Sequence, residues 1–327
     1  MKNRIIKLLG VVALIGSTLF GIAGILFESS FTRDGLKSKK KKEKPKKKKD
    51  EEEEATGWEK YRSIFDEGAT WFYSMKPETV TIESEDGLTL TGYYLPCENA
   101  KRTMVLVHGY HGSGVNDFGY ISRFYYKMRS NILIIDQRAH GKSEGKYIGF
   151  GVKERYDCLR WIQYLNETYG DSLPIFLDGV SMGGATVLMT CDLNLPKNVA
   201  GIVADCGFTS PWEICRHVLR TVYHLPSFPI LYFADWICRR KAHYSLKKVT
   251  TIETVKKSKV PILFVHGDTD NFVPTEMSRR NFAACDSEKQ LEIVKGAGHG
   301  LSYFTDMKYC EEKIRQFLET YTRMKTI

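Results

Sequence analysis

The pentapeptide Gly-Val-Ser-Met-Gly at residues 179–183 constrains this chain more than any other stretch. The residues before it, 174–177, are apolar and opened by a proline, as is typical of a buried strand. The residues after it, 184–190, continue at a spacing compatible with a helix. A serine between a strand and a helix needs a very tight turn, and the flanking glycines remove Cβ atoms that would collide there. The pattern predicts an exposed Ser181 hydroxyl, although this motif alone also fits a glycine-rich turn with an ordinary surface serine.

Two later strand ends carry the side chains that a nucleophilic serine requires. A serine hydroxyl is a weak nucleophile until a base accepts its proton, and the base needs an acid to orient it. Residues 260–265 form an apolar strand that runs into an acidic loop with Asp270. A second apolar stretch is followed by a glycine-flanked His299. This order indicates Ser181 as the nucleophile, His299 as the base and Asp270 as the acid.

Over about residues 75–325 the chain resembles the serine hydrolases of the α/β-hydrolase superfamily. Besides the pentapeptide, four motifs carry the resemblance: VLVHGY at 105–110, DQRAHGKS at 136–143, HGDTD at 266–270 and GHG at 298–300. The chain is most similar to membrane-anchored bacterial hydrolases near the serine aminopeptidase and prolyl-oligopeptidase-like branch. The resemblance implies a mostly parallel sheet with helices on both faces and a Ser-Asp-His triad, but it says little about the substrate.

Other carboxylates compete for the role of the acid. In the H-G-x-x-D pattern that the chain resembles, the acid matches Asp270, and Asp268 helps to hold the loop. Asp205 follows an earlier strand, where some hydrolases of this type carry their acid. Asp178, which precedes the serine turn, is then expected to be a structural carboxylate.

An oxyanion hole is expected from two backbone amides, because acyl transfer develops negative charge on the carbonyl oxygen. One donor is the amide of Met182, directly after the nucleophile and at the N-terminus of the predicted helix. The family pattern places the second on the residue that follows His-Gly, which is Tyr110.

The glycine-rich loop at 108–114 also has alternative interpretations. It resembles a phosphate cradle, but it lacks the Lys-Ser/Thr ending of a Walker A motif and the spacing of a dinucleotide fingerprint. His108 and His111 lack a carboxylate or cysteine at ligand spacing, which favours a structural role over a metal site. We therefore expect neither a cofactor nor a metal.

Strand and helix alternate along most of residues 58–327, which favours one α/β-hydrolase domain. The alternation fails at about 209–258, where a helical, aromatic-rich insertion falls at the place of a cap over the active site. A cap would exclude water and line a pocket for a substrate with an apolar part. A larger surface helix pair is the alternative interpretation.

The amino terminus suggests a membrane anchor. Residues 8–27 carry no charge and follow Lys2, Arg4 and Lys7. Twenty helical residues at 1.5 Å each match a hydrocarbon core of about 30 Å. The sequence therefore predicts an N-terminal transmembrane helix within residues 1–30, acting as a signal-anchor.

Residues 31–57 form a charged, low-complexity linker, with ten lysines followed by Asp50 and four glutamates. Such a segment cannot build a core. Anionic lipid head groups are the expected partner of the lysines, ahead of nucleic acid. Residues 1–57 hold fourteen basic and eight acidic side chains, a net +6 of the +9 of the chain, so the remainder is nearly balanced.

The side of the membrane on which the hydrolase domain lies stays open. Basic residues ahead of the apolar run favour the outer face, whereas the lysines after it favour the cytoplasm. The eight cysteines show no C-x-x-C spacing and look like buried thiols, which favours a reducing setting. The resemblance tips the expectation towards a cell-membrane protein with an extracytoplasmic domain.

We therefore expect a serine hydrolase that cleaves a carboxylic ester, thioester or amide of a small acyl substrate with an apolar part. An esterase is favoured over a peptidase. A membrane-tethered peptidase of the serine aminopeptidase type and a non-catalytic binding module on the same fold are the alternatives.

Overall fold

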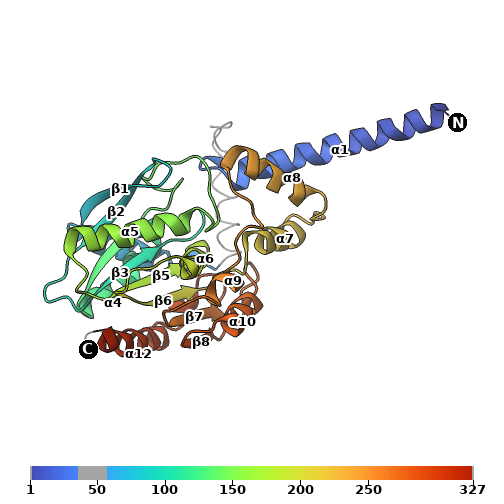
Figure 1. The fold of residues 1–327 in the computed structure, drawn as a ribbon. Helices are drawn as coiled ribbons and strands as arrows, with labels where there is room; N and C mark the ends of the chain where they lie inside the picture. The colour runs from blue at the N-terminus through green and yellow to red at the C-terminus, as the bar shows by residue number, and fades with distance from the viewer. Residues whose placement is uncertain (1, 36–56, 326–327) are drawn as a thin grey trace.

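A twisted sheet of eight strands organises the protein, in the order β1-β2-β4-β3-β5-β6-β7-β8 (Figure 1). The computed structural model describes the backbone of residues 2–35 and 57–325 and the side chains of 16–35 and 57–323. The hairpin of β1 and β2 is antiparallel, β2 is antiparallel to β4, and all other neighbours are parallel. The strands are β1 (Glu78–Glu83), β2 (Thr89–Leu95), β3 (Arg102–Val107), β4 (Ser130–Ile135), β5 (Ile175–Val180), β6 (Val199–Asp205), β7 (Ile262–Gly267) and β8 (Lys289–Val294).

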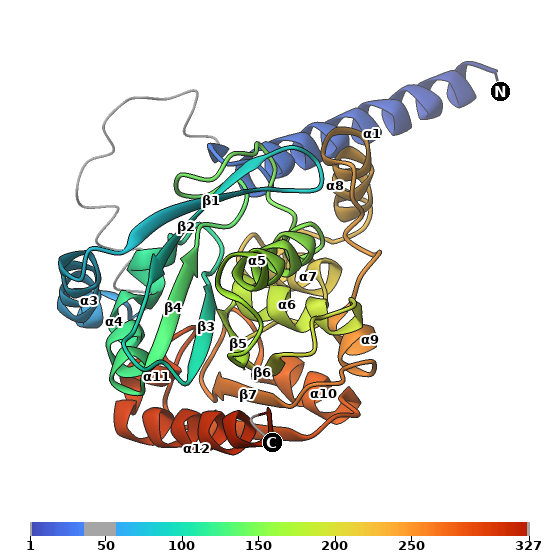
Figure 2. The same cartoon turned by 60° about the vertical axis from the view of Figure 1, so that its left-hand side comes forward.

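Helices cover both faces of this sheet (Figure 2). The α-helices are α1 (Lys2–Ser30), α3 (Arg62–Ser74), α4 (Gly114–Lys127), α5 (Glu154–Tyr169), α6 (Met182–Met189), α7 (Pro211–Thr221), α8 (Ile230–Ile237), α9 (Thr251–Val255), α10 (Thr275–Ala284), α11 (Ser302–Thr305) and α12 (Met307–Lys325). Shorter turns are the 3-10 segments η2 (Glu59–Tyr61) and η3 (Thr190–Asp192) and the π-helical segment η4 (Cys238–Ala242).

The central strands are apolar without interruption because both of their faces are buried. In β3, Met104 and Leu106 face one core with residues of α3, α4 and α12. Val105 and Val107 face the other core, with residues of α5, α6 and α9. This alternation follows from the two-residue period of a strand. The expected α/β-hydrolase fold, with a mostly parallel sheet and helices on both faces, is confirmed.

The parallel strands β3, β5, β6, β7 and β8 all end at one edge of the sheet, because they run in the same direction. Ligands of open α/β sheets bind outside the carboxyl ends of the strands. The loops that follow these strands therefore converge, and they carry the side chains that the sequence singles out.

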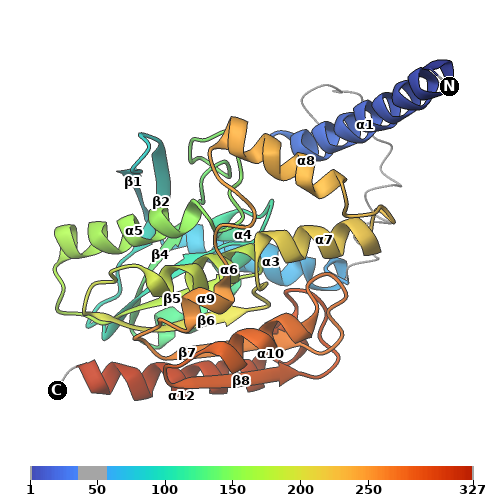
Figure 3. The same cartoon turned by 45° about the vertical axis from the view of Figure 1, so that its right-hand side comes forward.

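A third apolar cluster joins α7, α8 and η4 to the end of α1. Figure 3 shows α8 beside this end of α1. Ala23, Phe27 and Phe31 are almost completely buried in this cluster. The ring of Phe20 contacts the rings of Phe233 and Trp236, with centroids 5.6 and 5.8 Å away. The cap and the amino-terminal helix thus form one packed layer.

The apolar run at residues 8–27 predicts a membrane-spanning helix, and the structure does not support that expectation. The run does form a helix, α1. In the part of the chain that the structure describes, however, no helix meets the length and apolarity that a membrane span requires. The apolar side chains near the end of α1 pack against the cap instead. The linker residues 36–56, with all ten lysines of the run, lie outside the described residues.

Candidate active site

Ser181 lies between the end of β5 and the start of α6, as the sequence predicts. Its backbone has φ 56° and ψ −114°, an unfavourable region for a residue with a side chain. A Cβ at position 179 would collide with the carbonyl of Gly183, and one at position 183 would collide with the carbonyl of Val107. Only glycine fits both places, and the turn projects the serine beyond the edge of the sheet.

The structure brings Ser181, His299 and Asp270 together in one hydrogen-bonded line. The Ser181 Oγ lies 2.9 Å from the His299 Nε2, and the His299 Nδ1 lies 2.7 Å from the Asp270 Oδ2. The Asp270 carboxylate can only accept, so the Nδ1 carries a proton and the Nε2 of the neutral ring can accept the serine proton. A nucleophile, a base and an orienting acid need this arrangement.

Asp270 is held in its ionised form by four donors. Its Oδ1 accepts from the amides of Phe272 and Val273, at 2.9 and 2.8 Å. Its Oδ2 accepts from His299 and also contacts the His266 Nε2 at 3.1 Å. Burial by itself raises the pKa of Asp270, but the hydrogen bonds from both histidines outweigh it and hold the pKa well below the usual range.

His266 is a residue of this site that the sequence reasoning missed. It is fully buried at the end of β7, and its Nε2 faces both Asp270 and the carbonyl of Val273. Both partners are acceptors there, so the Nε2 carries the proton, while the Nδ1 lies 2.6 Å from the hydroxyl of Ser278. The sequence did contain a sign of this role, because His266 stands at a predicted strand end, four residues before Asp270.

The competing carboxylates have other partners. Asp268 accepts from the amide of Gly296 at 2.6 Å and so holds the loop that leads to His299. Asp205 accepts from the hydroxyl of Ser302 at 3.0 Å, and burial raises its pKa to about 6. Asp178 accepts from the phenol of Tyr125 at 2.5 Å, and burial raises its pKa to about 7. Of these three, none has a hydrogen bond to His299 among those that the structure describes.

The candidate oxyanion donors lie on either side of the serine. Met182 is the first residue of α6, so its amide is one of those without a carbonyl partner inside the helix. Tyr110 belongs to the loop after β3, and the Cβ of Ser181 would lie 3.5 Å from a Cβ at Gly109. The loop is pinned beside Tyr110, since the Gly109 amide donates to Asp117 at 3.0 Å and the His111 amide donates to His140 at 3.1 Å.

His108 fits a structural role. Its Nε2 accepts from the amide of Gln137 at 2.9 Å, so the proton of the neutral ring lies on Nδ1, which contacts the carbonyl of Gly109 at 2.7 Å. Burial lowers the pKa of His108 to about 3, which keeps the ring neutral. Both nitrogens are thus engaged in supporting the loop that carries Tyr110.

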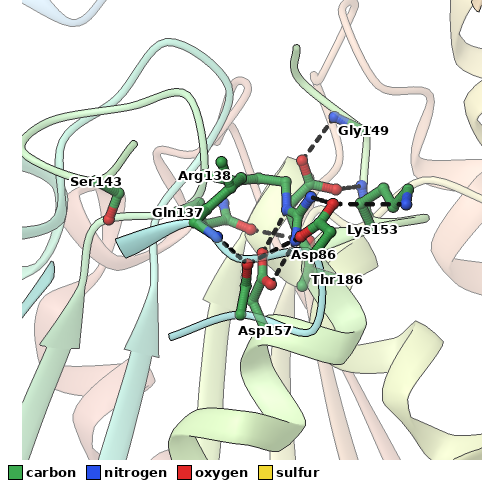
Figure 4. Close-up of polar contacts among 12 residues, drawn as sticks. Asp86, Gln137, Arg138, Ser143, Gly149, Lys153, Asp157 and Thr186 are labelled. Atoms are coloured by element: carbon green, nitrogen blue, oxygen red, sulfur yellow. Dashed lines mark hydrogen bonds and ion pairs between the residues drawn. The ribbon is translucent and has the colours of Figure 1, made fainter. Parts of the chain in front are cut away.

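A polar network around Arg138 and Gln137 lies beside this loop (Figure 4). Arg138 lies between two carboxylates, with contacts of 2.6 Å to Asp157 and 2.9 and 3.0 Å to Asp86. Its neighbour Gln137 donates to the carbonyl of His108 at 2.6 Å and accepts from Thr186 of α6 at 3.1 Å. Gln137 therefore ties the loop after β3 to α6, the helix that begins directly after Ser181.

One group of side chains in the described part of the chain has the spacing of metal ligands. Cys206, Asp270 and His299 place potential ligand atoms within 4.8 Å of one another. Asp270 and His299 already bond each other, and burial raises the pKa of Cys206 well above its usual range. A metal binds the thiolate rather than the thiol, so this donor set fits a hydrogen-bonded triad better than a metal centre.

An apolar cavity of about 210 Å³ opens beside Ser181. Its walls come from the end of α1, the loop after β3, the cap helices α7 and α8, and the loop that follows Asp270. Val222 and Tyr223, at the end of α7, are both about half exposed and mark its mouth. The contribution of α1 had no signal in the sequence, because its apolar run predicted a membrane span.

A serine, a histidine and an acid at the carboxyl edge of a mostly parallel sheet define a serine hydrolase of the α/β-hydrolase superfamily. The sequence pattern of the prolyl oligopeptidase family matches residues 147–325, more than half of the chain. The chain belongs to the prolyl oligopeptidase family.

Relatives and solved structures agree with this fold. The chain is 27% identical over 248 residues to the uncharacterized protein YqkD of Bacillus subtilis, covering 76% of this chain and 81% of YqkD. It is 24% identical to the protein bem46 of Schizosaccharomyces pombe, covering 67% and 69%. An esterase from Pyrococcus furiosus superposes with a TM-score of 0.63 at 22% identity, covering 76% of this chain and 92% of that one. An esterase from Exiguobacterium antarcticum gives 0.56 at 18% identity, covering 74% and 100%.

Proposed function

We propose that the protein hydrolyses carboxylic esters, including thioesters, of small acyl substrates through an acyl-enzyme on Ser181. The observation that carries the proposal is the line of hydrogen bonds from the Ser181 Oγ through His299 to Asp270, at 2.9 and 2.7 Å, beside an apolar cavity.

In the first half of the reaction, the Ser181 Oγ attacks the acyl carbon while its proton passes to the Nε2 of His299. The amides of Met182 and Tyr110 stabilise the negative charge that develops on the carbonyl oxygen. The carbon–oxygen or carbon–sulfur bond to the leaving group then breaks, and His299 returns the proton to that group. Asp270 keeps the ring oriented and stabilises its charged form.

In the second half, a water molecule attacks the acyl-enzyme and gives a proton to His299. The tetrahedral intermediate collapses, the Ser181 oxygen takes the proton back, and the carboxylic acid leaves. No step in either half needs a group beyond these side chains, the two amides and water.

A peptidase of the serine aminopeptidase type is the second candidate, because the matched family is one of peptidases. An aminopeptidase binds the ammonium group of its substrate, for which carboxylates are the usual partners. Among the described residues, those lining the cavity beside Ser181 include no carboxylate. This apolar lining supports ester hydrolysis as the better candidate.

The test uses the full chain, a panel of p-nitrophenyl esters and aminoacyl amides, and a fluorophosphonate probe. We expect ester turnover and covalent labelling by the wild type, and neither by Ser181→Ala, because the variant lacks the attacking oxygen. Labelling that persists in Ser181→Ala would remove this serine from the nucleophile role. A wild type that is inert to the probe would favour the non-catalytic binding module.

We also propose that the enzyme works at the cell membrane, with its catalytic domain on the outer face. The basic residues before residue 8 favour the outer face, and attraction of the lysines at 37–49 to anionic lipid head groups favours membrane association. Fractionation of cells and protease treatment of intact cells test both parts. An enzyme found wholly in the soluble fraction would contradict the proposal.

A further inference from the structure

The end of α1 is built into the hydrolase domain. Directly after the helix, the Ile148 amide donates to the carbonyl of Phe31 and the Arg33 amide donates to the carbonyl of Lys146, both at 2.9 Å. The Arg33 guanidinium donates to the carbonyls of the loop that holds Ser143. This segment therefore joins the domain by backbone and side-chain hydrogen bonds as well as by apolar packing.

Two stripes of the helix face the domain with the four-residue period of an α-helix. The first, Ala23 and Phe27 with Phe31 directly after the helix, is buried in the cap cluster. The second, Leu26 and Ser30, lines the cavity beside Ser181, as Phe31 does. Ala23 and Phe27 thus hold α1 against the cap, and Leu26, Ser30 and Phe31 face the cavity of Ser181.

The chemistry of the cavity selects a neutral, apolar ligand. Leu26 of α1 faces it together with Val218 and Leu219 of α7 and Leu231 and Ala234 of α8. None of the described side chains that line it carries a formal charge at neutral pH. A charged or strongly polar group would lose its hydration there without a partner.

The size of the cavity limits the length of that ligand. A cavity of about 150 Å³ is enough for the six carbons of benzene. In proportion, the 210 Å³ beside Ser181 would hold about eight carbons.

Resting on the proposed function, the geometry points to the end of α1 as a wall of the acyl-binding cavity, and to an acyl chain of about eight carbons as its occupant. Leu26 is then a residue that determines chain-length specificity. The same helix also reaches the oxyanion loop, because the phenol of Tyr110 donates to the carbonyl of Ser30 at 3.0 Å. An acyl chain that fills the cavity therefore lies against the segment that supports the second oxyanion donor.

The test measures kcat/KM of the full chain on p-nitrophenyl esters from acetyl to dodecanoyl. We expect kcat/KM of the wild type to rise up to fourfold per methylene and to fall beyond about eight carbons, since each buried methylene contributes to binding and the cavity then ends. In Leu26→Trp the ratio of octanoyl to acetyl turnover should fall at least 30-fold. Ile25→Trp is the matched control, because Ile25 is 58% exposed on the same helix and its ratio should not change.

The variant Leu26→Ala and a series of acetyl esters with alcohols of increasing length complete the test. Leu26→Ala enlarges the cavity and should move the optimum to longer chains, whether or not the tryptophan variant folds. Unchanged ratios in both Leu26 variants would overturn the inference. So would an effect confined to acetyl esters of increasingly long alcohols. If the wild type hydrolyses no ester at all, the proposed function itself has failed, and the inference fails with it.

Discussion

The carboxyl edge of the sheet and the layer of α1 and cap helices above it are held together by different interactions. At the edge, Ser181, His299 and Asp270 are linked by hydrogen bonds of 2.9 and 2.7 Å, and the side chain of Gln137 holds the neighbouring loop through the carbonyl of His108. In the layer above, α1, α7 and α8 meet through apolar and aromatic side chains. Hydrogen bonds demand direction as well as distance, whereas apolar packing demands mainly volume.

The difference suggests a division of roles. A substitution at the edge should lower the rate of hydrolysis for acyl chains of every length. A change in the layer should alter stability or chain length and leave the nucleophile reactive. Three substitutions examine this division, in order of decreasing effect.

The largest effect is expected for Asp270, the proposed acid. Asp270→Asn should lower kcat by about 10⁴-fold, or about 5.5 kcal/mol of barrier, because the amide favours the wrong tautomer of His299. Steady-state kinetics on one ester measure it. Asp205→Asn is the matched control, since Asp205 bonds Ser302 rather than His299, and it should stay within about tenfold of the wild type. A larger loss in Asp205→Asn than in Asp270→Asn would reverse the assignment of the acid.

An intermediate effect is expected where α1 meets the cap. Phe27 is fully buried and its ring stacks on that of Phe31, with centroids 5.8 Å apart. Phe27→Ala should weaken this packing by about 3–5 kcal/mol, the usual cost of such a cavity. Hydrogen exchange and limited proteolysis near α1 report it, and labelling of Ser181 by a small fluorophosphonate should persist.

Ile25→Ala provides the comparison for that experiment, because its exposed side chain should cost less than about 0.5 kcal/mol. Equal protection of α1 in the two variants would show that the helix is not fastened as the structure has it.

The smallest effect concerns a carboxylate behind the nucleophile. Burial raises the pKa of Asp178 to about 7, from an ordinary value near 3.8. The neutral acid therefore stabilises the fold fully at pH values below about 4, and this contribution is lost as the pH rises through about 7. Asp178→Asn cannot ionise, so the free energy of unfolding of the variant minus that of the wild type should grow by about 4 kcal/mol between pH 4 and pH 8.

Chemical denaturation at several pH values measures that difference. Tyr125→Phe tests whether the phenol that donates to Asp178 contributes to it. A difference that stays flat with pH would mean that Asp178 ionises in the folded protein as easily as in the unfolded chain.

Much of the catalytic edge could be predicted because each piece depends on a few neighbouring residues. Gly179 and Gly183 on either side of Ser181 indicate its tight turn. The apolar run before Asp270 indicates that this residue follows the end of a strand. The parallel direction of those strands then brings the ends to one edge. The contact between His266 and Asp270 was missed, because the course of the loop between them depends on the backbone amide of Phe272 and on Ser278 of helix α10.

The amino-terminal helix shows where such reasoning ends. The hydropathy of residues 8–27 indicates that their apolar side chains are buried away from water. Burial in a lipid core and burial against a cap helix both meet this condition. The packing of Phe27 and Phe31 on the cap depends on residues more than a hundred positions away. Nothing near α1 in the sequence distinguishes the two outcomes.

The sequence by itself determined the fold class, the exposed serine and the order of nucleophile, acid and base, because turns, strand periods and chain direction are local properties. Only the tertiary structure decided which carboxylate meets His299, how the second histidine supports it, and that α1 closes the cavity. Those outcomes depend on which surfaces fit together at long range, and shape and directed hydrogen bonds exist only once the chain has folded.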